Sequence, residues 1–214
     1  MRQYVEKKLE IFRETIKGIR IKDTKNKKNT FSSLKKFIPE LMEILHPMNI
    51  LEFAPGISTK EFLKYSSANI ISFETDPKWF KKYKDEIKNP RFKLMYKAPD
   101  WDLNDIKKEN IEFDFVFVDG GDRVKELKFC KQILSLTGVV FLHDAHREDY
   151  FDGIIAYPYI YFIERHSCLL LENKKIYNTL KEKIIPDYSC KCKYCSTEER
   201  RAYFSQFIGV EETI

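Results

Sequence analysis

The sequence predicts an α/β fold: a doubly wound, mostly parallel sheet with helices on both faces and an antiparallel hairpin at one edge. Two patterns support this prediction. Between residues 49 and 144, short β-rich runs alternate with helical stretches, as in the βαβ units of a parallel sheet. Beyond them, β-rich runs at 159–164 and 167–173 are separated by two residues, which favours a hairpin. Because βαβ crossovers are almost always right-handed, helices should cover both faces of the sheet.

Residues 1–46 are predicted to form an N-terminal helical lid or extension over the acceptor pocket. Apolar residues within 5–19 recur at spacings of three and four, as on one face of a helix. Residues 22–30, KDTKNKKNT, contain no apolar residue and predict a loop. A second helical pattern follows over 34–45, and Pro39 within it predicts a kink or a restart of the helix.

The predicted core domain spans residues 47–175, and residues 176–214 form a C-terminal appendage that contains cysteines. Within the core, the β-rich runs NILEF, NIISFE, RFKLMY, FDFVFVD and GVVFLHD begin at residues 49, 69, 91, 113 and 138. The helices between them are predicted at residues 58–66, 77–88, 101–109 and 121–136.

Composition excludes several classes of protein. With 214 residues, 43% hydrophobic, 33% charged and only 7 glycines, the chain can fill a core, which excludes disorder throughout and collagen-like repeats. The longest uncharged apolar-rich stretch, residues 153–163, is far shorter than the roughly 20 residues of a membrane-spanning helix. A charged N-terminus without an apolar run and an odd count of 5 cysteines favour a reducing, cytoplasmic setting without a disulfide framework.

Positive charge is concentrated in one segment. Residues 1–36 carry 12 Lys and Arg against 4 Asp and Glu, so the rest of the chain is slightly acidic although the whole has a net charge of +5. Such a segment can attract phosphate groups, and it can equally be a solvated helix and loop. Nucleic acid is therefore a possible partner that the sequence does not favour.

The residues after the first two predicted strands point to a nucleoside-type cofactor, because ligands of such sheets bind beyond the carboxyl ends of the strands. Gly56 lets a backbone approach a ligand closely, and Ser58 with Glu61 predicts a capping box at a helix N-terminus. Glu74 ends the second run, where an acidic side chain can accept hydrogen bonds from ribose hydroxyls. Asp76 and Pro77 then predict the cap and first turn of a helix.

Two other nucleotide fingerprints are missing. A nicotinamide or flavin fingerprint would need glycines at positions 54, 56 and 59, and only the second of these is glycine. A Walker A motif is also missing, since no Gly-Lys-Ser/Thr occurs in the sequence.

The segments LEFAPGIST, ISFETDPKWF, FDFVFVDG and GVVFLHD resemble the successive motifs of class I S-adenosylmethionine-dependent methyltransferases, over residues 49 to about 172. The resemblance implies a Rossmann-like methyltransferase fold whose reversed last strand is the terminal hairpin, and S-adenosylmethionine as the cofactor. It also implies that Glu74 holds the ribose hydroxyls and that Asp119 lies beside the cofactor. The residues that it places against the methionine part are Glu52, Ala54, Gly56, Ser58 and Thr59.

One position departs from the family's pattern. Ala54 stands where the family usually has the first glycine of its Gly-x-Gly motif. An alanine is readily accommodated there if its backbone φ is below zero.

The ends of the fourth and fifth predicted strands carry the densest group of titratable side chains, Asp119, His143, Asp144 and His146. Methyl transfer to a hydroxyl needs alignment of the acceptor and removal of its proton. A histidine is a suitable base near neutral pH. We therefore expect His143 or His146 to act as the base, with Asp144 as its orienting partner.

A divalent metal is an alternative at the same place. Asp119 and Asp144 are similar to the strand-end carboxylates that hold Mg²⁺ in catechol O-methyltransferase and its relatives. The third ligand of that pattern is an asparagine, and here Ala145 replaces it. His146 would be a poor substitute for a cation that prefers oxygen ligands, although a softer divalent metal could use Asp and His.

The appendage contains a compact cysteine cluster, Cys190, Cys192 and Cys195. These thiols could hold Zn²⁺, with Cys168 or His166 as the fourth ligand, or could be surface thiols without a metal. Cys130 lies in a helical pattern and is predicted to be in the core.

The main hypothesis is an S-adenosylmethionine-dependent methyltransferase, a transferase that methylates a hydroxyl of a small molecule or sugar. An N-methyltransferase or nucleic-acid methyltransferase is an alternative, although the sequence lacks the Asn/Asp-Pro-Pro-Tyr/Phe motif of base amino-group methylation. From another class, a non-catalytic Rossmann-like module would bind a nucleoside or a partner protein without turnover.

Overall fold

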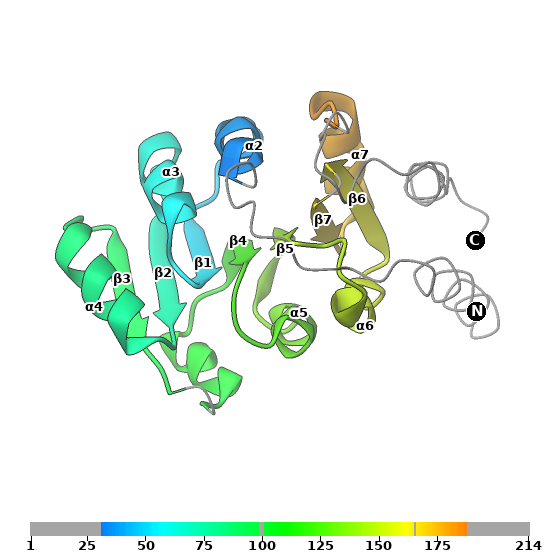
Figure 1. The fold of residues 1–214 in the computed structure, drawn as a ribbon. Coiled ribbons are helices and arrows are strands. Elements are labelled where there is room, and N and C mark those ends of the chain that lie inside the picture. The colour runs from blue at the N-terminus through cyan, green and yellow to red at the C-terminus, as the bar shows by residue number, and fades with distance from the viewer. Residues whose placement is uncertain (1–30, 99–100, 165, 188–214) are drawn as a thin grey trace, which may run out of the picture.

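The computed structural model describes residues 31–98, 101–164 and 166–187. Their strands form a seven-stranded sheet in the order β3-β2-β1-β4-β5-β7-β6 (Figure 1). The strands from β1 to β5 pair in parallel, and β7 is antiparallel to both β5 and β6. This arrangement confirms the predicted α/β sheet and its edge hairpin. The strands are β1 (Asn49–Phe53), β2 (Asn69–Glu74), β3 (Phe92–Tyr96), β4 (Phe113–Val118), β5 (Leu134–His143), β6 (Tyr159–Glu164) and β7 (Ser167–Leu171).

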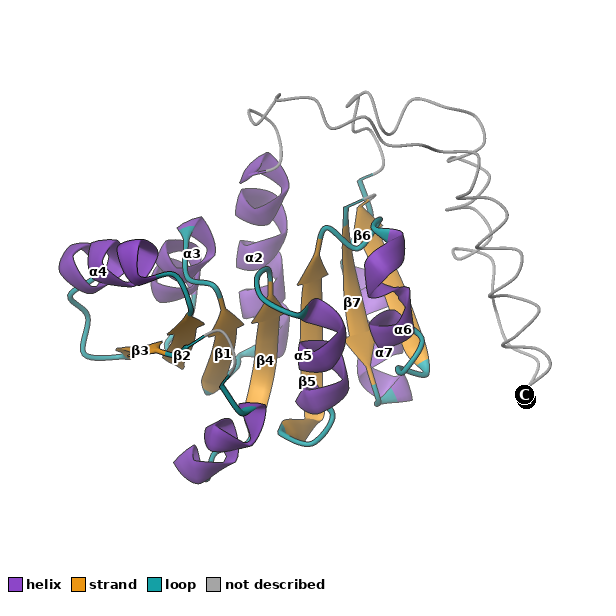
Figure 2. Cartoon of the chain, turned by 60° about the horizontal axis from the view of Figure 1, so that its bottom comes forward, coloured by secondary structure: helices purple, strands orange, loops and turns teal. Residues whose placement is uncertain are grey.

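Helices cover both faces of the sheet (Figure 2). On one face, α2, α3 and α7 bury an apolar cluster against the sheet, and on the other face η1, α5 and α6 bury a second cluster. The helix α4 packs against β2 and β3. The helices are α2 (Phe31–Leu45), α3 (Ile57–Tyr65), α4 (Pro77–Glu86), η1 (Leu103–Glu109), α5 (Arg123–Cys130), η2 (Glu148–Tyr150), α6 (Phe151–Ile154) and α7 (Lys174–Lys183).

The helix α2 does not restart at Pro39, which lies inside it. Buried apolar residues lie on both sides of the proline: Leu34 and Phe37 before it, Leu41 and Met42 after it. Since both halves of the apolar face bury against the same cluster, packing maintains one continuous helix despite the hydrogen bond that proline cannot donate. Of the predicted N-terminal extension, α2 is the part that the structure describes; residues 1–30 lie outside the described residues.

The boundary between α5 and β5 differs from the prediction. The expected helix over 121–136 ends at Cys130, and β5 already begins at Leu134. Leu127, Cys130 and Leu134 have helical spacing, but Leu134 pairs with Phe113 in the sheet. Here pairing with a neighbouring strand overrides a local helical pattern.

None of the described helices has the length and apolar character that crossing a bilayer would require.

Candidate active site

The loops that follow β1, β2, β4 and β5 lie along the same edge of the sheet, the one formed by the carboxyl ends of these strands, because the four strands are parallel. Two groups of carboxylates occupy this edge. The first, which we call the cofactor edge, consists of Glu52 and Glu74 with the loop 54–59. The second, the acceptor edge, consists of Asp119 and Asp144 with the side chains that contact them.

At the cofactor edge, Glu52 is completely buried within β1. Its Oε1 accepts a hydrogen bond from the Ser58 hydroxyl at 2.5 Å, and its Oε2 accepts from Thr59 at 2.7 Å and Ser72 at 2.5 Å. Burial raises the pKa of Glu52 to about 7; the three hydroxyl donors oppose this shift, and the charge of Asp119 adds to it. This carboxyl group therefore changes its charge near neutral pH.

The start of α3 corrects the predicted capping box. Gly56, not Ser58, precedes the first residue of the helix, and the Thr59 hydroxyl accepts a hydrogen bond from the Gly56 N–H at 2.9 Å. Ser58 lies inside the first turn with its hydroxyl on Glu52, so Glu61 has no capping partner there. Both hydroxyls of the loop thus connect the helix start to the buried carboxylate.

Ala54 does not meet the condition of a negative φ, because its φ is +68°, in the left-handed region that favours glycine. Its N–H donates to the carbonyl of Phe73 in β2 at 2.9 Å, which ties the loop to the neighbouring strand. A Cβ placed on Gly120, in the loop after β4, would come within 2.5 Å of the Ala54 Cβ. Ala54 therefore adopts a conformation that glycine tolerates better, and the close approach of the two loops depends on Gly120.

Glu74 lies at the carboxyl end of β2 and is buried. Its Oε1 accepts from the backbone N–H groups of Thr75 at 2.7 Å and Asp76 at 2.8 Å, which fixes the carboxyl group at the strand end. Asp76 in turn accepts from the backbone N–H groups of Lys78 and Trp79, and Pro77 follows in the first turn of α4. The predicted cap and first-turn proline are confirmed.

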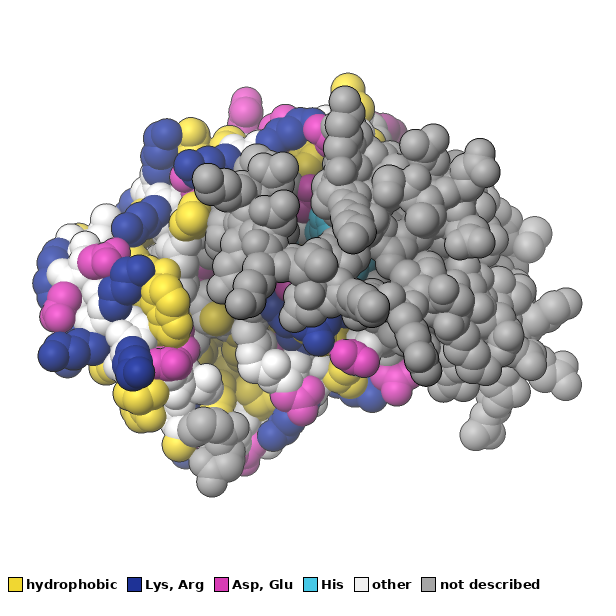
Figure 3. Space-filling model, viewed as in Figure 1, with side chains coloured by type: hydrophobic (Ala, Val, Ile, Leu, Met, Phe, Trp, Pro, Cys, Tyr) yellow, Lys and Arg dark blue, Asp and Glu magenta, His cyan; other side chains and the backbone are white. Residues whose placement is uncertain are grey.

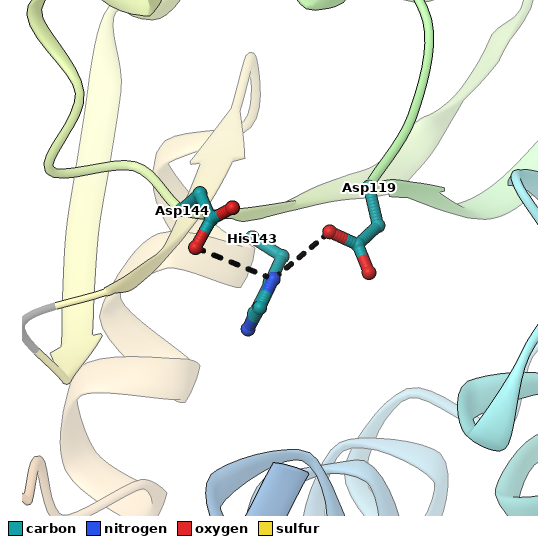
Figure 4. A group of neighbouring side chains, drawn as sticks. All are labelled: Asp119, His143 and Asp144. Carbon is teal, nitrogen blue, oxygen red and sulfur yellow. Dashed lines mark hydrogen bonds and ion pairs between the residues drawn. The ribbon is translucent and has the colours of Figure 1, made fainter. Parts of the chain in front are cut away.

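The acceptor edge brings together Asp119, His143 and Asp144 (Figure 4), whose potential ligand atoms all lie within 4.8 Å of one another. His143 Nδ1 is 2.9 Å from Asp119 Oδ1 and 3.7 Å from Asp144 Oδ1. Asp144 has a φ of +59°, a conformation that aspartate adopts more readily than most residues. His143 Nε2 is buried and has no hydrogen-bond partner among the described residues.

The charge of His143 is set by opposing effects. Burial lowers its pKa, but the hydrogen bond and charge of Asp119, with the charges of Asp144 and Glu164, outweigh burial and raise the pKa above the ordinary value. Because a carboxylate only accepts hydrogen bonds, Nδ1 carries the proton toward Asp119, and in the neutral imidazole Nε2 is left as the acceptor.

Sequence reasoning missed the role of Arg123, although it follows Asp119 by four residues. Its Nη2 donates to the Asp119 backbone carbonyl at 2.6 Å and to Asp119 Oδ1 at 3.0 Å, and lies 3.7 Å from Asp144 Oδ2. Its Nη1 donates to the Tyr150 hydroxyl, and its guanidinium lies over the Tyr150 ring. The helix start of α5 at Arg123 was the signal, because it directs the first side chain of the helix back over the loop 119–122.

Several solved structures share this arrangement of strands and helices. An O-methyltransferase from Bacillus cereus in complex with S-adenosylhomocysteine is 17% identical, with a TM-score of 0.53 over 76% of this chain and 88% of that chain. An S-adenosylhomocysteine-bound methyltransferase from Podospora anserina is 16% identical, with a TM-score of 0.50 over 65% of this chain and 78% of that chain. A precorrin-6y C5,15-methyltransferase from Geobacter metallireducens is 17% identical, with a TM-score of 0.50 over 64% and 77%.

The chain has the Rossmann-like methyltransferase fold. At these identities the likeness is one of fold, and no protein-family model or curated protein matches the sequence. The strand β2, which ends in Glu74, the strand β1, which contains Glu52, and the strand β4, which Asp119 follows, are neighbours in this sheet.

The acceptor edge does not suit Mg²⁺. The third potential ligand beside the two carboxylates is the nitrogen of His143, whereas Mg²⁺ prefers oxygen. Ala145 offers no side-chain donor, and the Arg123 guanidinium already contacts Asp119 and faces Asp144. The magnesium alternative therefore conflicts with the residues that are present.

The structure does not bring His146 into this group. His146 Nδ1 lies 2.9 Å from His166 Nδ1, and the two rings meet edge to face. Of the two histidines, His143 is the one that contacts both carboxylates.

The cysteine cluster Cys190, Cys192 and Cys195 lies outside the described residues. Cys168, offered as a fourth ligand, lies in β7 within the apolar cluster, and burial raises the pKa of its thiol. Since a raised pKa disfavours the thiolate form that binds a metal, Cys168 is a poor zinc ligand, and the fourth ligand of the predicted site stays a prediction. Cys130 is buried in the core as predicted.

Proposed function

We propose that the chain is an S-adenosylmethionine-dependent methyltransferase that methylates a hydroxyl of a small molecule or sugar. The observation that carries this proposal is the position of the two edges. Carboxylates suited to a nucleoside and a sulfonium lie at or near the ends of β1 and β2. On β5, at the same edge of the sheet, lies His143, whose Nε2 has no hydrogen-bond partner among the described residues.

The residues of the cofactor edge fit S-adenosylmethionine. Glu74 is fixed where it can accept from ribose hydroxyls, and Glu52 supplies negative charge beneath the loop that would face the methionine part. At Gly56 an added Cβ would have its nearest contacts at 3.8 and 4.0 Å, so the loop leaves space beside the start of α3. When bound, S-adenosylmethionine supplies an electrophilic methyl group.

His143 is the base in this proposal. Its Nε2 accepts the proton of the acceptor hydroxyl as the oxygen is methylated, and the resulting imidazolium is stabilised by Asp119 and Asp144. A buried nitrogen without a hydrogen bond is unfavourable, so a substrate hydroxyl would supply the interaction that Nε2 lacks among the described residues. Asp119 acts through His143 and is a positioning residue.

The charge pattern of the described surface gives no separate support to a nucleic-acid substrate. On the face shown in Figure 3, basic and acidic side chains both occur over the region of α4, whose sequence PKWFKKYKDE carries four lysines and two acidic residues. A nucleic-acid interface would need a stripe of one sign, which this part of the described surface lacks.

The acceptor class can be tested by methyl transfer from radiolabelled S-adenosylmethionine to matched panels of alcohols, sugars, amines and RNA. We expect labelled methyl ethers, and we expect His143→Gln to lower the rate by about 10²–10⁴-fold, the usual contribution of a general base. The exposed residue Glu112, which precedes β4 at the opposite end of the strand, provides a control as Glu112→Gln. Labelled amines or RNA with no labelled ether would overturn the hydroxyl assignment in favour of those acceptors.

We also propose, separately, that Cys190, Cys192 and Cys195 hold Zn²⁺ with a histidine. Support comes from Asp187, which precedes the cysteines by a few residues. Its backbone N–H donates to the carbonyl of Ile163 at 2.8 Å, and Ile163 is close in sequence to His166. Metal analysis of the purified chain should find one zinc that Cys192→Ser removes, and a zinc-free wild-type protein would contradict the proposal.

A further inference from the structure

We propose that the guanidinium of Arg123 occupies the place of a metal ion between Asp119 and Asp144, so that the acceptor edge works without a divalent cation. The proposal rests on the function proposed above and concerns the same site. The proposal goes beyond the poor fit of Mg²⁺, because it predicts that removing the Arg123 side chain creates a divalent-metal site that the wild-type protein lacks.

The contacts of Arg123 are those of a fixed cation. Nη2 contacts both the backbone carbonyl and the carboxylate of Asp119, at 2.6 and 3.0 Å, and lies 3.7 Å from the carboxylate of Asp144. The side chain is only 11% exposed. A guanidinium is charged at every accessible pH, so this positive charge is permanent.

Tyr150 prevents the side chain from swinging away. The Tyr150 hydroxyl accepts a hydrogen bond from Nη1, and the ring stacks under the guanidinium at 4.8 Å. Tyr150 is itself buried, at the end of η2 and directly before α6. A cation held on two sides in this way does not leave the carboxylates when a metal ion is offered.

The remaining donors would suit a metal if the guanidinium were absent. Asp119, His143 and Asp144 each offer one ligand atom, all within 4.8 Å of one another. Two carboxylates and an imidazole resemble the donor sets that bind Mn²⁺ and similar transition metals. In the wild-type protein, a divalent ion at this place would meet a fixed positive charge at close range, which opposes its binding.

The test is titration of Mn²⁺ into the purified chain, without cofactor, followed by electron paramagnetic resonance of the free ion. Arg123→Met removes the charge while keeping an unbranched side chain, and Arg123→Lys keeps a charge. Arg147 offers a matched control as Arg147→Met, because its guanidinium lies over the same Tyr150 ring at 4.9 Å but is paired with the exposed Asp149.

We expect Arg123→Met to bind Mn²⁺ at least ten times more tightly than the wild type, Arg123→Lys and Arg147→Met. Adding Asp144→Asn to Arg123→Met should abolish the gain. Tight Mn²⁺ binding by the wild type that Asp144→Asn removes, or a folded Arg123→Met with wild-type affinity, would overturn the proposal.

Two controls keep the outcome interpretable. If Arg123→Met fails to fold, as judged by circular dichroism, the comparison of wild type, Arg123→Lys and the wild type with Asp144→Asn still decides whether the native site takes Mn²⁺. Titration of S-adenosylhomocysteine into the same proteins reports on the cofactor edge independently. Failure of that binding would count against the proposed function, whereas the Mn²⁺ result concerns Arg123 alone.

Discussion

The cofactor edge and the acceptor edge use the same functional group, a carboxylate at a strand end, with different partners. At the cofactor edge, Glu52 and Glu74 are held by uncharged donors, which are hydroxyls and backbone N–H groups. At the acceptor edge, Asp119 and Asp144 face a guanidinium and an imidazole. The first arrangement leaves negative charge for a cationic ligand, and the second balances its charge within the protein.

The largest expected effect is at Asp119. In Asp119→Asn the amide can present its N–H₂ to His143 Nδ1, which favours the tautomer with the proton on Nε2 and removes the acceptor nitrogen. We expect turnover of a hydroxyl acceptor to fall by about 10²–10⁴-fold, as for loss of a general base. Steady-state kinetics with a hydroxyl acceptor at saturating S-adenosylmethionine would measure this. Unchanged turnover would mean that Asp119 does not position His143 and would contradict the separate role given to the acceptor edge.

The pH dependence of turnover should report His143. The base must be neutral to accept a proton, and the pKa of His143 is raised above 6.5, chiefly by Asp119 acting against burial. The rate constant kcat/KM should therefore rise with pH, by about tenfold per pH unit below that pKa, and level off above it. In the residual activity of Asp119→Asn, the rising limb should move to lower pH. If kcat/KM rises over the same pH range in Asp119→Asn as in the wild type, the titrating group is not His143.

Cofactor binding should have its own pH dependence, set by Glu52. The pKa of this carboxyl group is raised to about 7 by burial, and a cationic ligand favours its ionised form. Affinity for S-adenosylmethionine should thus weaken as pH falls below about 7, by up to tenfold per pH unit, and be constant above it. Calorimetry between pH 5.5 and 8.5 would show this slope. Glu52→Gln should abolish it, and an identical slope in that variant would contradict the assignment.

The smallest effect is expected at Ala54, whose φ is +68°. Glycine tolerates this conformation, so Ala54→Gly should raise the free energy of unfolding by about 0.5–1 kcal/mol after allowing for the greater freedom of glycine in the unfolded chain. Urea unfolding would measure the change. The converse control, Gly120→Ala, places a Cβ 2.5 Å from that of Ala54 and should destabilise the protein. We therefore expect the free energy of unfolding to increase in Ala54→Gly and to decrease in Gly120→Ala.

The fold could be predicted because its strands are marked by continuous apolar runs that end in polar residues. All seven strands match runs visible in the sequence, and the chief error, at Leu134, arose where a helical spacing continued into a strand. The residues next to Leu134 in the sequence do not reveal that it pairs with Phe113, which is distant in sequence.

The positions of the candidate residues in the fold could be predicted from the sequence, but their contacts could not. Strand-end position identified Glu52, Glu74, Asp119 and Asp144, whereas the direction of side chains from the following loops was not encoded in spacing. Arg123 reaches back from the first residue of α5, and His146 turns to His166 across the hairpin end. Each contact depends on loop geometry that forms only when the strands are paired.

The most direct test of the central claim is calorimetric titration of S-adenosylhomocysteine into the wild-type chain and into Glu74→Ala. The account predicts micromolar binding by the wild type and at least a hundredfold loss in the variant, because Glu74 is fixed where ribose hydroxyls would donate to it. Glu112→Gln should bind like the wild type. No binding by a folded wild-type protein, or equal binding by Glu74→Ala, would contradict the assignment of this edge to the cofactor.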